Sequence, residues 1–96
     1  MKILAIEKDI QSMESKDKQS LLKDEALTVW NLYQDGIIRE IYFRADQSNA
    51  VLVLECETIM EAEETLSKLP LVKNSVIKFD LIPLKPYSGF SRLFQS

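Results

Sequence analysis

The chain has 96 residues and a net charge of −3, and 46% of its residues are hydrophobic and 28% charged. These values predict one folded domain, residues 1–96, with a modest core, because a chain of this size buries only about 60–65% of its unfolded surface. No basic stripe interleaved with aromatics is present, which argues against nucleic acid as a partner. One cysteine and no histidine exclude an intramolecular disulfide, a histidine-ligated metal or haem, and a histidine general base.

No apolar run in the sequence approaches the ~20 residues of a membrane span. The apolar stretch Ile3–Ile6 is interrupted by Glu7 and is too short for the core of a signal peptide. We therefore expect a cytoplasmic protein without a membrane partner. We also expect neither a cofactor nor a metal.

Alternation and helical spacing predict six regular elements. In chain order they are a strand, a helix, two strands, a helix and a strand, at residues 2–8, 17–35, 37–45, 50–57, 58–69 and 75–84. Residues 9–16 are predicted to form a loop, and DQSN at residues 46–49 a hairpin turn. This order is typical of the ferredoxin-like βαββαβ arrangement, an α+β fold in which an antiparallel sheet carries both helices on one face.

The first helix carries one apolar stripe at helical spacing, made of Leu22, Ala26, Val29, Trp30 and Tyr33. We expect Trp30 and Tyr33 to lie in the core rather than to form a stacking platform for a ligand. Gly36 is the expected stop of this helix, since glycine readily adopts the left-handed conformation found there.

The second helix is expected to begin at Thr58, with Glu61 at the spacing of a capping box, and to end at Pro70. Its apolar stripe is Ile59, Ala62, Leu66 and Leu69. Just before it, Cys56 is predicted to be a packed residue and not a nucleophile. No histidine is available to activate this thiol, and its two flanking glutamates would raise its pKa.

Period-two alternation assigns the strand side chains to the two faces of the sheet. Beneath the helices we expect Leu4, Ile6, Ile41, Phe43, Leu52, Leu54, Ile77, Phe79 and Leu81. On the face that no helix covers we expect Ile3, Ala5, Glu7, Glu40, Tyr42, Arg44, Val51, Val53, Glu55, Lys78, Asp80 and Ile82. An apolar floor ringed by ionisable groups invites association. We therefore expect a homodimer, or a higher oligomer built from dimers, in which two sheets stack into a barrel.

Pro83 and Pro86 fit the end of the last strand, because proline lacks the N–H that a central ladder needs. The chain is expected to leave its own sheet there. The tail that follows, residues 85–96, carries the spaced apolar residues Phe90, Leu93 and Phe94. Docking of this tail on a partner subunit is expected, and the alternatives are a lid and a disordered end.

The stretches LSKLPL…IKFDLIPL, LYQDGIIREIYFRAD and AVLVLECETIMEAEETL resemble the muconolactone isomerase family over about residues 20–88. The Leu-Pro-Leu and Pro-Leu pair is the most specific part. The resemblance implies a dimeric α+β barrel with a pocket between the sheet and the helices or at the barrel mouth. It also implies an activity that moves a double bond in a small lactone acid by proton transfer, without metal or cofactor. Where the family carries a histidine and a tryptophan, this chain has Glu40 and Tyr42, so no catalytic residue is carried over.

The candidate pocket residues are ionisable side chains of the strands: Glu7, Glu40, Tyr42, Arg44, Glu55, Lys78 and Asp80. A carboxylate in a water-poor cavity has a raised pKa that suits a general base. Arg44 or Lys78 is suited to hold the carboxylate of a substrate. The competing interpretation is that these groups pair with one another across the dimer and do no chemistry.

Three functions remain open from the sequence. The first is a cofactor-free isomerase that acts on a small organic acid or lactone. The second is a non-catalytic module that binds a small molecule in the same cavity, and the third is a structural homodimer whose barrel is filled by side chains. A cofactor-free oxygenase of the same fold ranks below them, because nothing in the sequence singles out a phenolic substrate.

Overall fold

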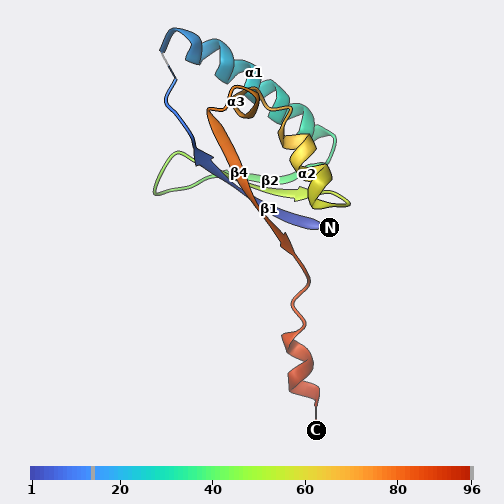
Figure 1. Cartoon of the computed structure of the whole chain (residues 1–96). Helices are drawn as coiled ribbons and strands as arrows, with labels where there is room; N and C mark the ends of the chain where they lie inside the picture. The colour runs from blue at the N-terminus through green and yellow to red at the C-terminus, as the bar shows by residue number, and fades with distance from the viewer. Residues whose placement is uncertain (14, 96) are drawn as a thin grey trace.

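Helices cover one face of an antiparallel sheet in the computed structural model of this chain (Figure 1). The structure describes residues 1–13 and 15–95; residues 14 and 96, which belong to the predicted loop 9–16 and to the tail, lie outside the described residues. The elements are β1 Lys2–Asp9, α1 Ser15–Gln34, β2 Ile38–Phe43, β3 Ala50–Glu55, α2 Ile59–Leu66, α3 Pro70–Lys73, β4 Ile77–Leu84 and a 3₁₀ helix at Gly89–Phe94. The strands lie in the order β2-β3-β1-β4, and each neighbouring pair is antiparallel. The predicted ferredoxin-like α+β fold is therefore confirmed.

The end of α1 follows the glycine signal of the sequence. Gly36 has a φ of +80°. Its N–H donates to the Tyr33 carbonyl at 3.1 Å, and the Ile37 N–H donates to the Leu32 carbonyl at 3.0 Å. This pair of bonds is the Schellman arrangement, which satisfies helical carbonyls and requires a left-handed residue. It turns the chain directly into β2.

The start of α2 follows the predicted cap. The Thr58 hydroxyl accepts a hydrogen bond from the Glu61 N–H at 3.0 Å, and the Glu61 carboxylate accepts one from the Glu57 N–H at 3.1 Å. The helix ends at Leu66, earlier than expected, and Pro70 begins the short helix α3 instead of ending α2. Proline fits the first turn of a helix, because the N–H that it lacks would have no helical partner there.

The core lies between the helices and the sheet. Its buried side chains are Ile3, Ala5, Leu32, Ile38, Ala50, Leu52, Leu54, Cys56, Ala62, Leu66 and Leu69. On β4, Ile77 is buried and Phe79 and Leu81 pack against the core. The predicted helix-facing sides of β3 and β4 are therefore correct.

The predicted face of β1 is wrong. Ile3 and Ala5, expected on the uncovered face, are 0% exposed and lie opposite buried leucines of β3. Leu4 and Ile6 alternate with them and face the other way. Glu7 shares the side of Ile3 and Ala5, so it lies on the helix-facing side of the sheet. Alternation alone does not decide the matter, because residues 3–6 are all apolar and only the pairing with β3 fixes the face.

The edge strand β2 is only partly covered by the helices. A bulge between Ile38 and Glu40 shifts its register, so that Ile38 and Ile41 both lie opposite helix-facing leucines of β3. Ile38 is buried, but Ile41 and Phe43 are exposed, Phe43 at 77%. Apolar side chains therefore remain uncovered between β2 and α1.

The opposite face of the sheet, called the open face here, carries none of the described helices (Figure 1). Its side chains are Lys2, Leu4, Ile6, Lys8, Glu40, Tyr42, Val51, Val53, Glu55, Lys78, Asp80, Ile82 and Leu84. Beyond β4 the tail runs away from the body, and the molecule is 65 Å long. None of the helices in the described ranges is long and apolar enough to cross a membrane.

The core assignment predicts that Leu54→Ala lowers the free energy of unfolding by about 2–5 kcal/mol, because a fully buried leucine leaves a cavity behind. Urea denaturation followed by circular dichroism measures this change. Met60→Ala, on the exposed side of α2, is the control, and its effect is expected to stay within about 0.5 kcal/mol. A loss for Leu54→Ala as small as that of the control would contradict the assigned core.

Candidate functional site

An apolar cavity of about 860 Å³ opens between α1 and the helix-facing side of the sheet. Its floor includes Ile41, Leu52 and Phe79, and Leu71 of α3 contributes to its wall. The ionisable residues that line it are Glu7, Lys18, Glu25, Tyr33 and Arg44. A concave, largely apolar space with a few convergent polar groups is the usual form of a small-molecule site.

One face of α1 forms the roof of this cavity, with Lys18, Leu22, Glu25, Ala26, Val29, Trp30 and Tyr33. It contains the apolar stripe seen in the sequence. The expectation that Trp30 and Tyr33 lie in the core is wrong, because Trp30 is 58% and Tyr33 46% exposed. The neighbouring Leu32 holds the helix on the core instead. The apolar stripe of α1 therefore lies above the uncovered part of β2. There it forms the roof of the cavity and does not pack into the core.

Glu25 is a carboxyl group in this roof that sequence reasoning missed. It is half-buried, and its Oε1 accepts a hydrogen bond from the Leu71 N–H at 3.0 Å, at the start of α3. Burial raises the pKa of the Glu25 carboxyl, the Leu71 bond opposes this, and the charge of Glu7 raises the pKa further. The sequence held one signal: an acidic residue interrupts the stripe three positions after Leu22 and four before Val29.

Glu7 faces the same cavity from β1 in a fixed position. Its Oε2 accepts a hydrogen bond from the Asn49 side-chain amide at 2.9 Å, and its Oε1 accepts one from the Ala50 N–H at 3.3 Å. Asn49 is buried and also donates to Asp9 at 3.0 Å. These contacts tie β1 to the turn before β3. They hold a carboxylate whose charge acts on Glu25.

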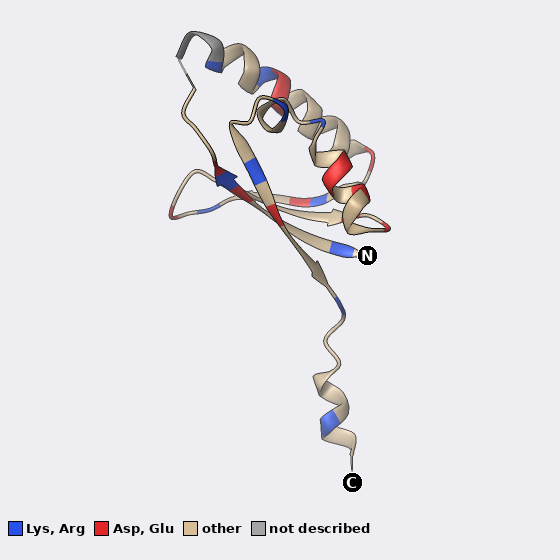
Figure 2. Cartoon of the chain, in the orientation of Figure 1, with Lys and Arg blue, Asp and Glu red and all other residues tan. Residues whose placement is uncertain are grey.

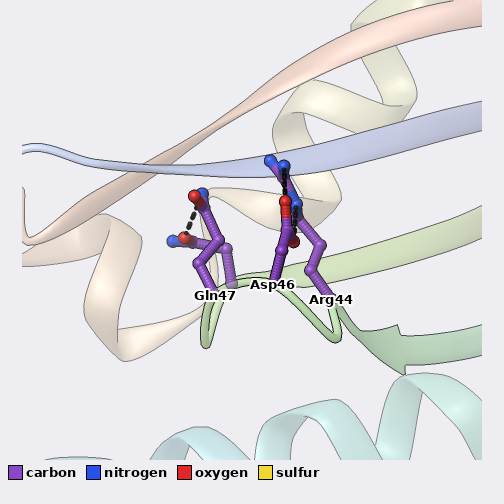
Figure 3. A network of polar contacts seen from close by, with 4 residues as sticks. Arg44, Asp46 and Gln47 are labelled. Carbon is purple, nitrogen blue, oxygen red and sulfur yellow. Dashed lines mark hydrogen bonds and ion pairs between the residues drawn. The ribbon is translucent and has the colours of Figure 1, made fainter.

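Arg44 lines the cavity, but its charge is compensated. Its guanidinium donates to the Asp46 carboxylate in the turn between β2 and β3, from Nε at 2.9 Å and from Nη2 at 2.7 Å (Figure 3). This bidentate contact raises the pKa of Arg44 and lowers the pKa of Asp46. In the same turn Gln47 donates to Asn49 at 2.7 Å, so the polar contacts continue as far as Glu7.

The other five predicted pocket residues lie on the open face. The Tyr42 hydroxyl donates to Glu40 at 2.8 Å, and this bond together with the charge of Glu40 raises the pKa of Tyr42. Glu55 lies 3.6 Å from the N-terminal amino group. Lys78 and Asp80 occupy alternate positions of β4 on the same face. The structure therefore brings Glu7 and Arg44 together at the cavity, and it leaves these five on the other side of the sheet.

Cys56 is packed in the core, as predicted. Burial raises the pKa of its thiol, and the charges of Glu61 and Glu55 add to this shift. A neutral, buried thiol is a poor nucleophile. Within the described residues, no group of three or more Cys, Asp or Glu side chains is arranged to hold a metal ion.

The cavity thus combines two carboxylates, two cations and an aromatic wall. A carboxyl group with a raised pKa, such as Glu25, is suited to take a proton from carbon and to return it. Lys18 lies seven residues before Glu25, about 10 Å along the helix axis. That spacing suits a small acid whose charged end meets Lys18 while its other end meets Glu25. Trp30, Tyr33 and Phe43 offer flat apolar surfaces to a ring.

The raised pKa of Glu25 predicts a pH-dependent effect of Glu25→Gln on stability. Relative to the unfolded chain, the native state disfavours the charged carboxylate. The contribution of wild-type Glu25 to the free energy of unfolding is therefore fully present below its ordinary pKa of 4.5. It is lost as the pH rises through the raised pKa, because the carboxylate then ionises in the native state. Glutamine stays neutral and can still accept the Leu71 hydrogen bond. The free energy of unfolding of the variant minus that of the wild type should hence increase from about pH 4 to about pH 7.

Urea denaturation at several pH values measures this difference. Asp24→Asn is the matched control, since Asp24 is the exposed neighbour of Glu25 on α1, and it should show no comparable trend. A difference for Glu25→Gln that shrinks as the pH rises would contradict the proposed electrostatics.

Comparison with known proteins agrees with the fold. No family model and no curated protein matches the chain. The crystal structure of muconolactone isomerase has a TM-score of 0.79 to this chain at 18% sequence identity, over 92% of each chain. The 5-chloro-2-hydroxyhydroquinone dehydrochlorinase of Burkholderia phenoliruptrix, in complex with 2,5-dihydroxybenzoquinone, has a TM-score of 0.61 at 16% identity, over 93% of this chain and 98% of that one. The resemblance is therefore confirmed at the level of the fold, and this chain has the ferredoxin-like α+β architecture of muconolactone isomerase.

Proposed function

We propose that the cavity beneath α1 is the active site of a cofactor-free isomerase that moves a proton within a small organic acid or lactone. The observation that carries this proposal is the Glu25 carboxyl, which lies half-buried in an apolar cavity with a raised pKa. In the proposed reaction Glu25 removes a proton from a carbon next to a carbonyl group. It then returns the proton to another carbon of the same electron-delocalised intermediate, so that a double bond moves and no other reactant is needed.

The remaining residues of the cavity have positioning roles in this proposal. Lys18 holds the carboxylate of the substrate, and the aromatic side chains of the wall keep water from the reacting carbon. Glu7 is fixed by Asn49 and Ala50, and its charge adds to the rise in the pKa of Glu25 that burial causes. The two structural neighbours support a small, largely cyclic substrate, since their names refer to a lactone and to a hydroquinone.

The second candidate function is a module that binds a small molecule in this cavity without converting it. This candidate is favoured because the polar groups of the cavity are already hydrogen-bonded within the chain. Glu7 is held by Asn49, Glu25 by the Leu71 N–H and Arg44 by Asp46. Groups fixed in this way can recognise a ligand without moving a proton. Such a module would be stabilised by about 2.7 kcal/mol at a ligand concentration one hundred times the dissociation constant.

The isomerase proposal predicts proton exchange catalysed by Glu25. Muconolactone and a panel of small unsaturated lactones and acids are incubated with the protein in D₂O, and loss of C–H signals is followed by proton NMR. At least one compound should exchange or isomerise faster than in buffer. Glu25→Gln should lower that rate by about 10²–10⁴-fold, the usual contribution of a general base.

Asp24→Asn is the control and should keep the wild-type rate. An unchanged rate in Glu25→Gln would remove Glu25 from the mechanism. Thermal stabilisation by a compound that never exchanges faster than in buffer would instead favour the binding module.

We further propose that two copies associate through the open face. Its centre is apolar, with Leu4, Ile6, Val51, Val53 and Ile82 side by side on neighbouring strands. An exposed apolar centre rimmed by charges is typical of an association surface, and two copies of one sheet can bury it symmetrically. Association through the open face does not depend on catalytic activity, so a purely structural homodimer would show it too.

The homodimer proposal predicts that Val53→Asp weakens association. Val53 lies between Leu4 and Glu40 near the middle of the open face, and a charge buried there without a partner is disfavoured. The dissociation constant from sedimentation velocity should rise at least about tenfold. Met60→Asp, on the exposed side of α2, is the control. An unchanged dissociation constant for Val53→Asp, or a monomeric wild type, would refute the proposed interface.

A further inference from the structure

The roof of the cavity changes in character along α1. The charged residues of this helix all lie within residues 16–25, and residues 26–34 carry no charge (Figure 2). The lining residues divide in the same way. The polar end of the cavity, as it is called here, has Lys18 and Glu25 in its roof. The apolar end is lined by Val29, Trp30 and Tyr33 of α1 and by Ile41 of β2.

The apolar end is an open space above a buried floor. Trp30, Tyr33 and Ile41 are exposed, whereas Leu52 and Leu69, which line the same cavity, are buried. Aromatic side chains offer large flat surfaces for apolar contact. A concave apolar surface with an aromatic wall is suited to take up an apolar part of a small molecule.

The cavity is larger than a single lactone ring with a carboxylate requires. Such an acid has about ten non-hydrogen atoms, which take up about 300 Å³ if each needs about the volume of a water molecule in the liquid. The volume of the cavity is about 860 Å³. A single-ring acid therefore fills well under half of this space, and a larger apolar ligand gains binding free energy by removing more apolar surface from water.

The spacing along α1 places the additional volume at the apolar end. Glu25 lies about 10 Å along the helix axis from Lys18, and Trp30 and Tyr33 lie about 7.5 Å and about 12 Å farther on. A substrate whose carboxylate meets Lys18 and whose reacting carbon meets Glu25 occupies the polar end alone. An extended chain spans about 1.2 Å per bond. A further group of about six to ten bonds therefore reaches from Glu25 to Trp30 and Tyr33.

We propose that the substrate of this cavity is a cyclic acid that carries an apolar group of about six to ten carbon atoms, and that this group binds at the apolar end, between Trp30, Tyr33 and Ile41. The inference rests on the proposed function, which places the reacting carbon at Glu25, and it adds the chemical class of the substrate. Lys18 holds one end of the substrate by its charge, and the apolar group holds the other end. The carbon between them is thereby kept against Glu25, as proton transfer requires.

Straight-chain carboxylates of different length test this proposal. Butanoate, octanoate and tetradecanoate are titrated into the wild-type protein below the concentrations at which they aggregate. Binding is followed by calorimetry and by the emission of Trp30, the single tryptophan of the chain. From a carboxylate at Lys18, octanoate reaches about as far as Glu25, and tetradecanoate reaches about as far as Trp30.

Tetradecanoate should therefore move the emission maximum of Trp30 to shorter wavelength, and butanoate and octanoate should not. The dissociation constant of tetradecanoate should be at least about tenfold lower than that of octanoate, because each buried methylene group strengthens binding by up to about fourfold. Equal dissociation constants for the two acids, or an unshifted Trp30 emission at saturation with tetradecanoate, would overturn the proposal. A segment of another chain that already fills the apolar end would give that same negative result.

Trp30→Gln removes the aromatic wall of the apolar end. It should raise the dissociation constant of tetradecanoate at least about tenfold and change that of octanoate by less than about twofold, as measured by calorimetry. Leu27→Gln is the matched control, since Leu27 is an exposed residue of the same helix that does not line the cavity. Tyr33→Ser is a second variant of the apolar end, and the same selective loss is expected. Equal losses for both acids would contradict a subsite that recognises the longer ligand.

Lys18→Gln tests the orientation of the ligand. It should weaken octanoate and tetradecanoate by the same factor, because both acids present the same carboxylate to Lys18. Lys23→Gln, an exposed residue of α1 outside the cavity, is the control and should leave both dissociation constants unchanged. If Lys18→Gln weakens neither acid, the carboxylate does not bind at the polar end, and the proposed orientation fails.

The outcomes separate this inference from the proposed function, because saturated carboxylates bind without being converted. If lactones exchange protons in D₂O but the carboxylates bind independently of their length, the apolar subsite fails and the role of Glu25 stands. If tetradecanoate binds as expected and none of the lactones and acids of the panel exchanges, the isomerase proposal fails. The apolar end then belongs to a module that binds its ligand without converting it.

Discussion

The limited cover that the helices give to the sheet is the constraint on which the rest of this structure depends. Within the described residues, α1, α2 and the short helix α3 pack on one face of the sheet of four strands. They bury Ile3, Ala5 and Leu54 completely, but they cover the edge strand β2 only in part and leave the whole open face without a cover. Apolar burial contributes roughly 25 cal/mol per Å², and a chain of this size has little such surface to spare. The surfaces left uncovered are therefore the places where a ligand or a second copy gains most by binding.

Glu25 and Glu7 show how the same cavity treats two carboxyl groups differently. Glu7 is fixed by the Asn49 amide and the Ala50 N–H, and its position is accounted for by the packing of β1 against the turn before β3. Glu25 has one hydrogen bond and loses water on burial, which raises its pKa. An apolar residue at this point of the stripe would favour folding more. A residue that opposes stability in a cavity is where function is to be sought, because activity and stability are often in conflict at such sites.

The sequence correctly predicts the helix ends, because these are set by interactions between neighbouring residues. Gly36 ends α1 because a left-handed residue is needed there, and Thr58 begins α2 because its hydroxyl satisfies a free N–H. Alternation predicts the wrong face of β1, because residues 3–6 are apolar on both sides and only the pairing with β3 decides the face. The helical stripe predicts Trp30 in the core, but a stripe does not reveal whether the opposing surface reaches this side chain. Glu25 was missed for the same reason, as its burial depends on where α3 and the sheet lie.

The uncovered open face of the sheet favours an assembly of identical chains. Each chain brings one open face, so two copies of this chain offer matching surfaces in equal number. In a closed symmetric assembly every such surface finds its complement, and none is left over. Pro83 fits this arrangement: it lies in the edge strand β4 opposite Ile3, where a missing N–H is tolerated and further pairing at the outer edge is discouraged. The chain beyond β4 then leaves the sheet with the aromatic rings of Tyr87, Phe90 and Phe94 exposed, and such exposed apolar groups favour contact with another chain.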